Sequence, residues 1–100
     1  MKTFTQKVYA VAHKIPKGKV ATYGQIARLA GNIKASRAVG MCMHGNTDTE
    51  QVPCHRVVSA TGALTGYAFG GVSVKKKMLL TEGVIFRGER VDLEKSAWKK

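Results

Sequence analysis

The sequence has 100 residues, and its 17 Lys and Arg outnumber its 6 Asp and Glu, which gives a formal net charge of +11. This length predicts one domain spanning residues 1–100, and no apolar run approaches the roughly 20 residues of a membrane-spanning helix. The N-terminal apolar residues are interrupted by Gln6, Lys7, His13 and Lys14, which excludes a signal peptide and favours an intracellular location. The surplus of positive charge favours nucleic acid as the partner; a ribosome-associated protein or simple solubility is the alternative.

Two helices with a short extended piece between them are predicted first along the chain. Apolar residues at helical spacing indicate a helix over residues 3–14, whose first residue is its N-cap. Residues 20–21 are expected to be extended. Thr22 then caps a second helix over residues 23–31, and Gln25 stands at the third position after this cap, as in a capping box.

A third helix, over residues 35–44, forms a helix-turn-helix pattern with the second and takes the place of the recognition helix. Arg37 is the only long basic side chain in this helix, and its neighbours are small. Small residues let a helix backbone approach DNA closely without reading many bases, which would suit sequence-tolerant binding through the minor groove. The same residues would suit close packing against a neighbouring helix, and the sequence leaves both interpretations open.

The second half of the chain is predicted to combine two hairpins with one helix. The segment "HRVVSATGALTGY" at 55–67 indicates a hairpin that turns at 61–62. A helix is expected over residues 72–83, followed by a second hairpin over 84–93 that turns at a glycine. Residues 94–100 are expected to form a basic tail. The predicted fold is therefore mainly α with small β hairpins.

Cys54 and His55 follow Pro53 in "QVPCHRVVSA" and are the candidates for nucleophilic chemistry. A cysteine nucleophile needs ionisation to the thiolate, a base within hydrogen-bond reach and a third group that orients the base. Three carboxylates in the chain are candidates for that third group: Asp48, Glu50 and Glu82. From the residues alone the pair stays ambiguous, because free cysteines are often buried and inert.

A zinc site is the other chemistry that this part of the sequence suggests, through Cys42, His44, Cys54 and His55. Their spacing is not a common spacing of zinc ligands, and adjacent Cys and His side chains point in divergent directions. We therefore expect neither a metal nor a cofactor, and we expect Cys42 to pack within the third helix.

The segment "PCHRVV" at 53–58 resembles the active-site signature of the O6-alkylguanine-DNA alkyltransferases. Four further blocks resemble that family in the same order along the chain: "GKVATYGQIARLAG", "SRAVGMCMHGN", "TGALTGYAFGG" and "KKKMLLTEG". Five ordered blocks, which span nearly the whole chain, are far more specific than the cysteine signature alone. The resemblance implies the family's C-terminal domain, a winged helix-turn-helix-like DNA-binding domain, without its N-terminal ribonuclease-like domain.

The resemblance also implies a role for several residues at a flipped base. Cys54 would accept the alkyl group from O6 of guanine, and His55 would take the thiol proton through a water. Glu82 would hold the imidazole in the required tautomer, which selects this residue among the three carboxylates. Tyr23 would donate its proton toward guanine N3, and Arg37 would fill the space that the flipped nucleotide leaves.

Further residues are assigned to the pocket and to the DNA surface by the same resemblance. Asn46 would buttress the active-site turn, and the carbonyls of Cys54 and Val57 would accept the guanine amine. The rest of the expected pocket is Tyr67 as its wall, Ala68 donating its amide to O6, Phe69 affecting its size, and Lys75 near the leaving base or the backbone. The expected DNA contacts besides Tyr23 and Arg37 are Thr22, Lys34, Ala35, Ser36 and Gly40.

Two functions within this family fit the sequence. The first is single-turnover repair of O6-alkylguanine in double-stranded DNA, with Cys54 as the acceptor. The second is that of the alkyltransferase-like proteins, which are similarly short, bind the lesion without chemistry and hand it to nucleotide excision repair; typical members lack the cysteine present here. A general helix-turn-helix module would not explain the relay residues. We expect a monomer, located in the cytoplasm with the nucleoid or in a eukaryotic nucleus.

Overall fold

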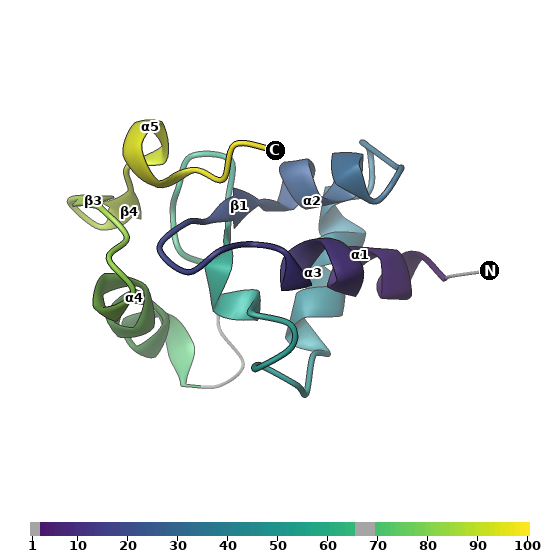
Figure 1. Ribbon diagram of the computed structural model, residues 1–100, viewed down its shortest axis with the longest axis horizontal. Coiled ribbons are helices and arrows are strands. Elements are labelled where there is room, and N and C mark those ends of the chain that lie inside the picture. Colours follow the sequence, from purple (N-terminus) through teal and green to yellow (C-terminus); the bar gives the residue numbers. More distant parts are fainter. Residues whose placement is uncertain (1–2, 66–69) are drawn as a thin grey trace.

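The computed structural model describes residues 3–65 and 70–100. Its elements follow in the order α1 (Phe4–His13), β1 (Ala21–Thr22), α2 (Tyr23–Leu29), α3 (Ser36–His44), the 3₁₀ turn η1 (Cys54–Arg56), β2 (Val57–Val58), α4 (Gly71–Thr81), β3 (Phe86–Arg87), β4 (Arg90–Val91) and α5 (Leu93–Ser96). Figure 1 shows α1, α2 and α3 grouped on one side of the molecule and α4, the β3–β4 pair and α5 on the other. The predicted mainly helical fold is confirmed. Within the described ranges, no helix has the length and apolar character to span a membrane.

The first two helices begin where polar side chains bind their free amides. Thr3 and Gln6 form a complete capping box at α1. The Gln6 amide donates to the Thr3 hydroxyl at 3.1 Å, and the Thr3 amide donates to the Gln6 side-chain oxygen at 2.9 Å. At α2 only half of the predicted box is present. Thr22 accepts the Gln25 amide at 3.1 Å, but the Gln25 side chain donates to the Trp98 carbonyl at 2.8 Å. The Gln25 side chain, predicted to bond the start of α2, therefore bonds the C-terminal segment instead.

The turn between α2 and α3 produces the predicted helix-turn-helix. After α2 ends at Leu29, Gly31 adopts a φ of 97°, a left-handed conformation that glycine reaches without a steric penalty. Ala35 is the N-cap of α3, so the helix begins at Ser36, one residue later than predicted. The turn brings α3 against α2, and both helices contribute to one core.

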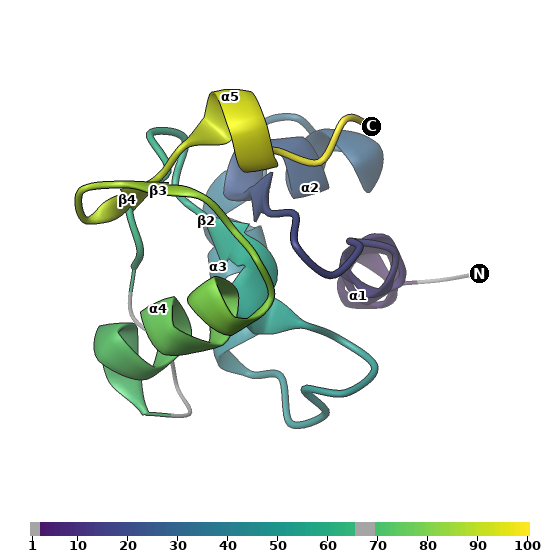
Figure 2. The ribbon, with the colours of Figure 1, turned by 60° about the vertical axis from the view of Figure 1, so that its left-hand side comes forward.

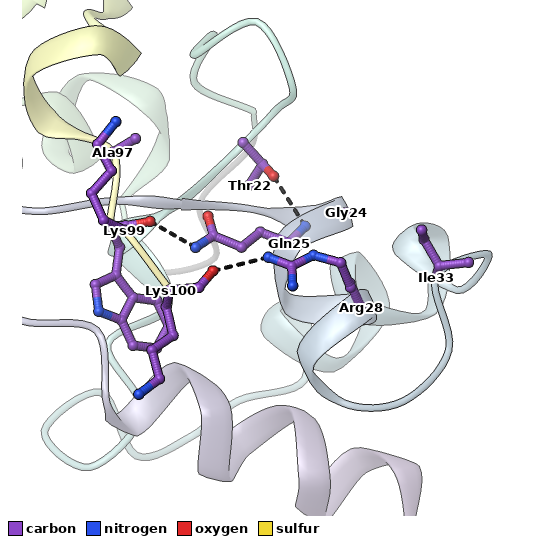
Figure 3. Close-up of a pocket in the computed structure, with 9 residues that line it drawn as sticks. Thr22, Gly24, Gln25, Arg28, Ile33, Ala97, Lys99 and Lys100 are labelled. Carbon is purple, nitrogen blue, oxygen red and sulfur yellow. Dashed lines mark hydrogen bonds between the residues drawn. The ribbon is translucent and has the colours of Figure 1, made fainter.

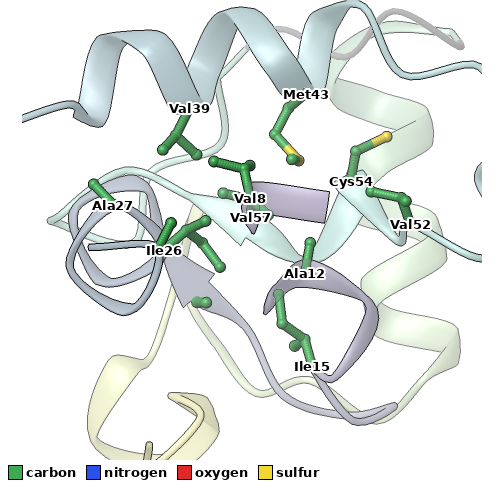
Figure 4. Close-up of a cluster of buried hydrophobic side chains, with 12 residues drawn as sticks. Val8, Ala12, Ile15, Ile26, Ala27, Val39, Met43, Val52, Cys54 and Val57 are labelled. Atoms are coloured by element: carbon green, nitrogen blue, oxygen red, sulfur yellow. The ribbon is translucent and has the colours of Figure 1, made fainter. Parts of the chain in front are cut away.

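The larger hydrophobic cluster lies between the three N-terminal helices and β2 (Figure 4). Val39 and Met43 enter it from α3, whereas Arg37, Met41 and His44 on the same helix are exposed. The buried members of this cluster are Val8, Ala12, Ile15, Ala21, Ile26, Ala27, Ala30, Val39, Met43, Val52, Cys54 and Val57. The candidate nucleophile is therefore part of the core that α2 and α3 share.

The hairpin predicted over residues 55–67 is wrong for residues 55–65, and its last two residues lie outside the described ranges. Strand β2 (Val57–Val58) pairs in parallel with β1 (Ala21–Thr22), which precedes it by a long connection. Both valines are fully buried, as is usual for parallel strands covered on both faces, so the alternating pattern of a hairpin did not apply. The predicted turn is present, closed by a 2.9 Å bond from the Gly62 amide to the Ser59 carbonyl.

The second predicted hairpin is confirmed. Strands β3 and β4 are antiparallel, with Phe86 opposite Val91, and Gly88 adopts a φ of 67° in the turn between them. Val91 reaches a smaller hydrophobic cluster, whose buried members are Val20, Val58, Leu79, Val84 and Val91. This second cluster attaches α4 and the hairpin to the central strands.

The prediction of a basic tail at residues 94–100 is wrong. Asp92 accepts the Glu94 amide at 3.0 Å and starts the short helix α5. The Val20 amide then donates to the Ser96 carbonyl at 2.9 Å, and the Trp98 amide donates to the Val20 carbonyl at 2.7 Å. The segment thus continues beside β1 and reaches α2, where Figure 2 shows the C-terminal end of the chain.

Candidate active site

Cys54 is the first residue of η1, between the loop that follows α3 and strand β2. The turn is closed by bonds from the Cys54 amide to the Val52 carbonyl at 2.8 Å and from the Arg56 amide to the Pro53 carbonyl at 2.9 Å. The residue is 5% exposed, and Figure 4 shows it at the edge of the core with its sulfur directed away from the cluster's centre. The fold therefore fixes this thiol in a largely desolvated position.

Asn46 ties the end of α3 to the loop that leads to Cys54. Its Nδ2 donates to the Val52 carbonyl at 2.8 Å, and its Oδ1 accepts the Asp48 amide at 3.1 Å. The side chain is buried with both polar ends bonded, which is the condition under which a buried amide stabilises its surroundings. Asn46 therefore links the end of α3 to the loop before Cys54, and its role as a buttress of the active-site turn stays a prediction.

Glu82 is the carboxylate that meets His55, at 3.0 Å from Oε1 to Nε2, although 27 residues separate the two. It follows α4 as its C-cap. Asp48, one of the two rejected candidates, instead accepts the Gln51 amide at 3.2 Å within its own loop. With Nε2–H donating to the carboxylate, Nδ1 of His55 carries the free lone pair.

Arg56 completes this arrangement, and sequence reasoning missed it. Its guanidinium donates to both carboxylate oxygens of Glu82, at 3.0 and 2.7 Å, and to the Ile15 carbonyl at 2.9 Å. A bidentate guanidinium holds a carboxylate in one plane, so Glu82 has little freedom to turn away from His55. The signal available in the sequence was its position directly after the Cys54–His55 pair.

The environment keeps His55 neutral and Glu82 charged near neutral pH. Burial lowers the pKa of His55, with Arg56 and Lys75 acting in the same direction, and this outweighs the opposing attraction of Glu82. Burial opposes ionisation of Glu82, but the hydrogen bonds from Arg56 and the interaction with His55 outweigh it and lower the pKa. His55 Nδ1 is buried and has no hydrogen-bond partner among residues 3–65 and 70–100. An imidazole in this state has a free acceptor for a proton.

Lys75 is buried in the site, where its side chain bonds to a backbone carbonyl. Its Nζ donates to the Val57 carbonyl at 2.7 Å, and the residue is 1% exposed. Burial lowers the pKa of Lys75 to about 8, against a smaller electrostatic contribution from Cys54 that raises it. The Val57 carbonyl, expected to accept the guanine amine, therefore already has one donor, and a second lone pair remains for another.

Replacing Lys75 by Met is expected to remove a pH dependence of stability. The folded-state pKa is about 8 and the ordinary value is 10.5. Between these values the unfolded chain binds more protons, so the free energy of unfolding of the native protein rises with pH, by about 3 kcal/mol in total. Urea unfolding between about pH 7 and 10.5 should show the native protein gaining stability relative to Lys75→Met. A difference that is constant with pH would contradict the buried position of the ammonium group.

Tyr23 and Arg37 occupy the helix-turn-helix part of the molecule. The Tyr23 hydroxyl lies 2.5 Å from Oγ1 of Thr65, and its ring packs against the same cluster that contains Cys54. A methyl group at Gly40 would lie 3.9 Å from the Tyr23 ring, so α3 passes close to this tyrosine. Arg37 is exposed one residue into α3.

The other sequence-predicted residues lie at the starts of α2 and α3 or outside the described ranges. Thr22 caps α2, and Lys34 and Ser36 are exposed at the start of α3, whereas Ala35 packs against the larger cluster. Tyr67, Ala68 and Phe69 lie outside the described residues. Within the described ranges, no three His, Cys, Asp or Glu side chains are grouped as metal ligands.

Comparison with known proteins agrees with this geometry. Residues 3–84 match the family model of the 6-O-methylguanine DNA methyltransferase DNA binding domain. The methylated-DNA–protein-cysteine methyltransferase of Methanosarcina acetivorans is 48% identical over 80 residues, which are 80% of this chain and 51% of that protein. The human protein of the same name is 48% identical over 82 residues, 81% of this chain and 39% of that protein. The chain thus spans about half the length, or less, of these curated relatives.

Two solved structures share the fold over most or all of the chain. The first is S. pombe Atl1 in complex with damaged DNA containing O6-carboxymethylguanine. It is 33% identical to this chain with a TM-score of 0.85, and the match covers 100% of both chains. Mycobacterium tuberculosis OGT in complex with DNA is 41% identical with a TM-score of 0.76, over 82% of this chain and 49% of that one. The chain therefore belongs to the family of the 6-O-methylguanine DNA methyltransferase DNA-binding domain.

Proposed function

We propose that this chain repairs O6-alkylguanine in double-stranded DNA by moving the alkyl group to Cys54, one group per protein molecule. The observation that carries the proposal is the His55–Glu82 pair next to a buried Cys54, in a chain of this family. A cysteine with only a packing role would not need a neutral imidazole fixed by a carboxylate.

The proposed reaction is an in-line displacement at the alkyl carbon. Sγ of Cys54 forms a bond to that carbon as the bond from the carbon to guanine O6 breaks. The thiol proton passes through a water to Nδ1 of His55, and Glu82 stabilises the imidazolium that results. Tyr23 donates a proton to guanine N3, so the base leaves as a neutral species and the hydroxyl regains its proton from solvent. The thioether product is stable, and each molecule therefore acts once.

The helix-turn-helix supports DNA binding with the target base flipped out. The alkyl group on a paired base is out of reach of a buried thiol, so the nucleotide has to leave the stack. We propose that Arg37 fills the space it vacates, since this side chain is exposed and is the only long basic one on α3. Thr22, Lys34, Ala35, Ser36 and Gly40 are proposed to contact the duplex, and the net charge of +11 favours this partner.

The base pocket is proposed to be formed by Cys54 and by residues that follow it in the chain. The Cys54 and Val57 carbonyls would accept the guanine amine with their remaining lone pairs. Tyr67 as the wall of the pocket, Ala68 as an amide donor to O6 and Phe69 as a limit on alkyl size stay predictions.

The proposal is tested by weighing the intact protein after incubation with a duplex that contains O6-methylguanine. We expect a gain of one methylene mass, about 14 Da, that reaches one group per molecule and is absent in Cys54→Ala. Lesion-selective binding with no gain in mass would contradict transfer.

A second candidate function is lesion binding without transfer, followed by delivery to nucleotide excision repair. The observation in its favour is the match to Atl1, which covers the full length of both chains. This candidate predicts that Cys54→Ala and the native protein bind the lesion equally and that neither is modified. The intact-mass measurement therefore separates the two functions.

A further inference from the structure

The C-terminal segment extends beyond residue 84, where the match to the family model ends, and it is fixed against α2 by backbone contacts. The Gln25 side chain donates a hydrogen bond to the Trp98 carbonyl at 2.8 Å. Nη2 of Arg28 donates one to the Lys100 carbonyl at 2.9 Å. The Trp98 side chain packs against the larger hydrophobic cluster. These contacts hold two consecutive lysines, Lys99 and Lys100, beside the helix-turn-helix.

An open hollow of about 570 Å³ lies between this segment and α2 (Figure 3). Three cationic residues line it, Arg28 from α2 and Lys99 and Lys100 from the C-terminal segment, and no acidic residue of the described chain does. The complete lining is Thr22, Gly24, Gln25, Arg28, Ile33, Ala97, Trp98, Lys99 and Lys100. We refer to it as the C-terminal hollow. A group of three cationic residues with no acidic side chain among the lining residues favours an anionic occupant.

We propose that the C-terminal hollow binds the sugar-phosphate backbone of the DNA duplex on one side of the lesion. This inference rests on the proposed function and extends it to a surface that the family match covers only on its α2 side. Thr22 and Gly24 line the hollow and flank Tyr23, the residue proposed to contact the flipped guanine. A Cβ atom at Gly24 would meet no atom within 4 Å, so this position at the α2 end of the hollow is open.

A continuous polyanion fits these observations better than a small anion. The hollow is open, its cations come from separate segments of the chain, and it is adjacent to the proposed DNA-binding face. Lysine and arginine side chains that neutralise DNA phosphates release condensed counterions, which strengthens binding regardless of base sequence. The C-terminal segment would therefore add affinity for damaged and undamaged duplex alike, while Tyr23 and Arg37 would discriminate the lesion.

The test compares Lys99→Ala/Lys100→Ala with the native protein at salt concentrations from about 50 to 200 mM. Both contacts to α2 use backbone carbonyls, so alanine leaves these anchors in place. Lys14→Ala/Lys17→Ala removes the same charge from exposed positions after α1 that do not line the hollow, and serves as the matched control. Dissociation constants are measured for an O6-methylguanine duplex and for its undamaged counterpart.

We expect the Lys99/Lys100 variant to lose roughly 10-fold in affinity for both duplexes, with a slope of log K against log salt that is smaller by about 1 to 2. The single tryptophan, Trp98, should also change its fluorescence when duplex is added. A slope equal to that of the native protein, or an equal change in the control, would overturn the inference. A native protein that binds both duplexes but gains no mass from the O6-methylguanine duplex would instead contradict the proposed function, so the two failures are distinguishable.

Discussion

Glu82→Gln is expected to slow methyl transfer by roughly 10²- to 10⁴-fold, the range by which a correctly oriented general base accelerates such a step. The amide removes the negative charge that would stabilise protonated His55. It also presents an NH₂ group that competes for Nε2 and favours the wrong tautomer. Arg56 would lose its carboxylate partner at the same time.

The measurement is a single-turnover transfer rate with protein in excess over an O6-methylguanine duplex. Glu50→Gln is the matched control, because it makes the same chemical change at an exposed position. Thermal unfolding of both variants separates a loss of chemistry from a loss of fold. A transfer rate for Glu82→Gln equal to that of the control would show that the carboxylate does not orient the base.

Tyr23→Phe is expected to reduce the transfer rate by about 10²-fold at saturating protein, with a much smaller change in the dissociation constant. Phenylalanine keeps the ring that packs against the core but removes the only group proposed to protonate guanine N3. The leaving base would then depart with a negative charge, which raises the barrier.

Tyr9→Phe is the control for Tyr23→Phe. The Tyr9 hydroxyl donates to the Cys42 carbonyl at 2.8 Å, so this variant loses one hydrogen bond between α1 and α3 without touching the proposed site. We expect a modest loss of stability and an unchanged transfer rate. If Tyr23→Phe lost lesion binding but transferred the methyl group at the native rate once bound, its hydroxyl would be a DNA contact and not an acid.

Local signals predicted the elements whose interactions lie within a few residues. The caps at Thr3 and Thr22, the turn glycines and the last hairpin depend on contacts between near neighbours in sequence, and all are present. The parallel pairing of β1 with β2 and the attachment of the C-terminal segment involve residues far apart in the chain. Nothing in the local pattern of those segments specified a distant partner.

The candidate site shows the same division. Cys54 and His55 are adjacent and were evident from the sequence. The sequence alone did not decide which of three carboxylates orients His55. Glu82 was selected only by resemblance to a family, because the partners of the His55–Glu82 contact are 27 residues apart. Arg56 was missed, and the bond from Lys75 to the Val57 carbonyl was not foreseen, since both depend on how α4 packs against η1.

The central claim is that Cys54, and not another thiol, accepts the alkyl group. Trypsin should release residues 38–56 as one peptide that contains both cysteines of the chain, Cys42 and Cys54. Cys42 is an internal control, because it is half-buried in α3 without a neighbouring imidazole relay. After reaction with an O6-methylguanine duplex, fragmentation of this peptide should place the added methyl group on Cys54 alone. A methyl group on Cys42, or an unmodified peptide from a protein saturated with the lesion, would contradict the account.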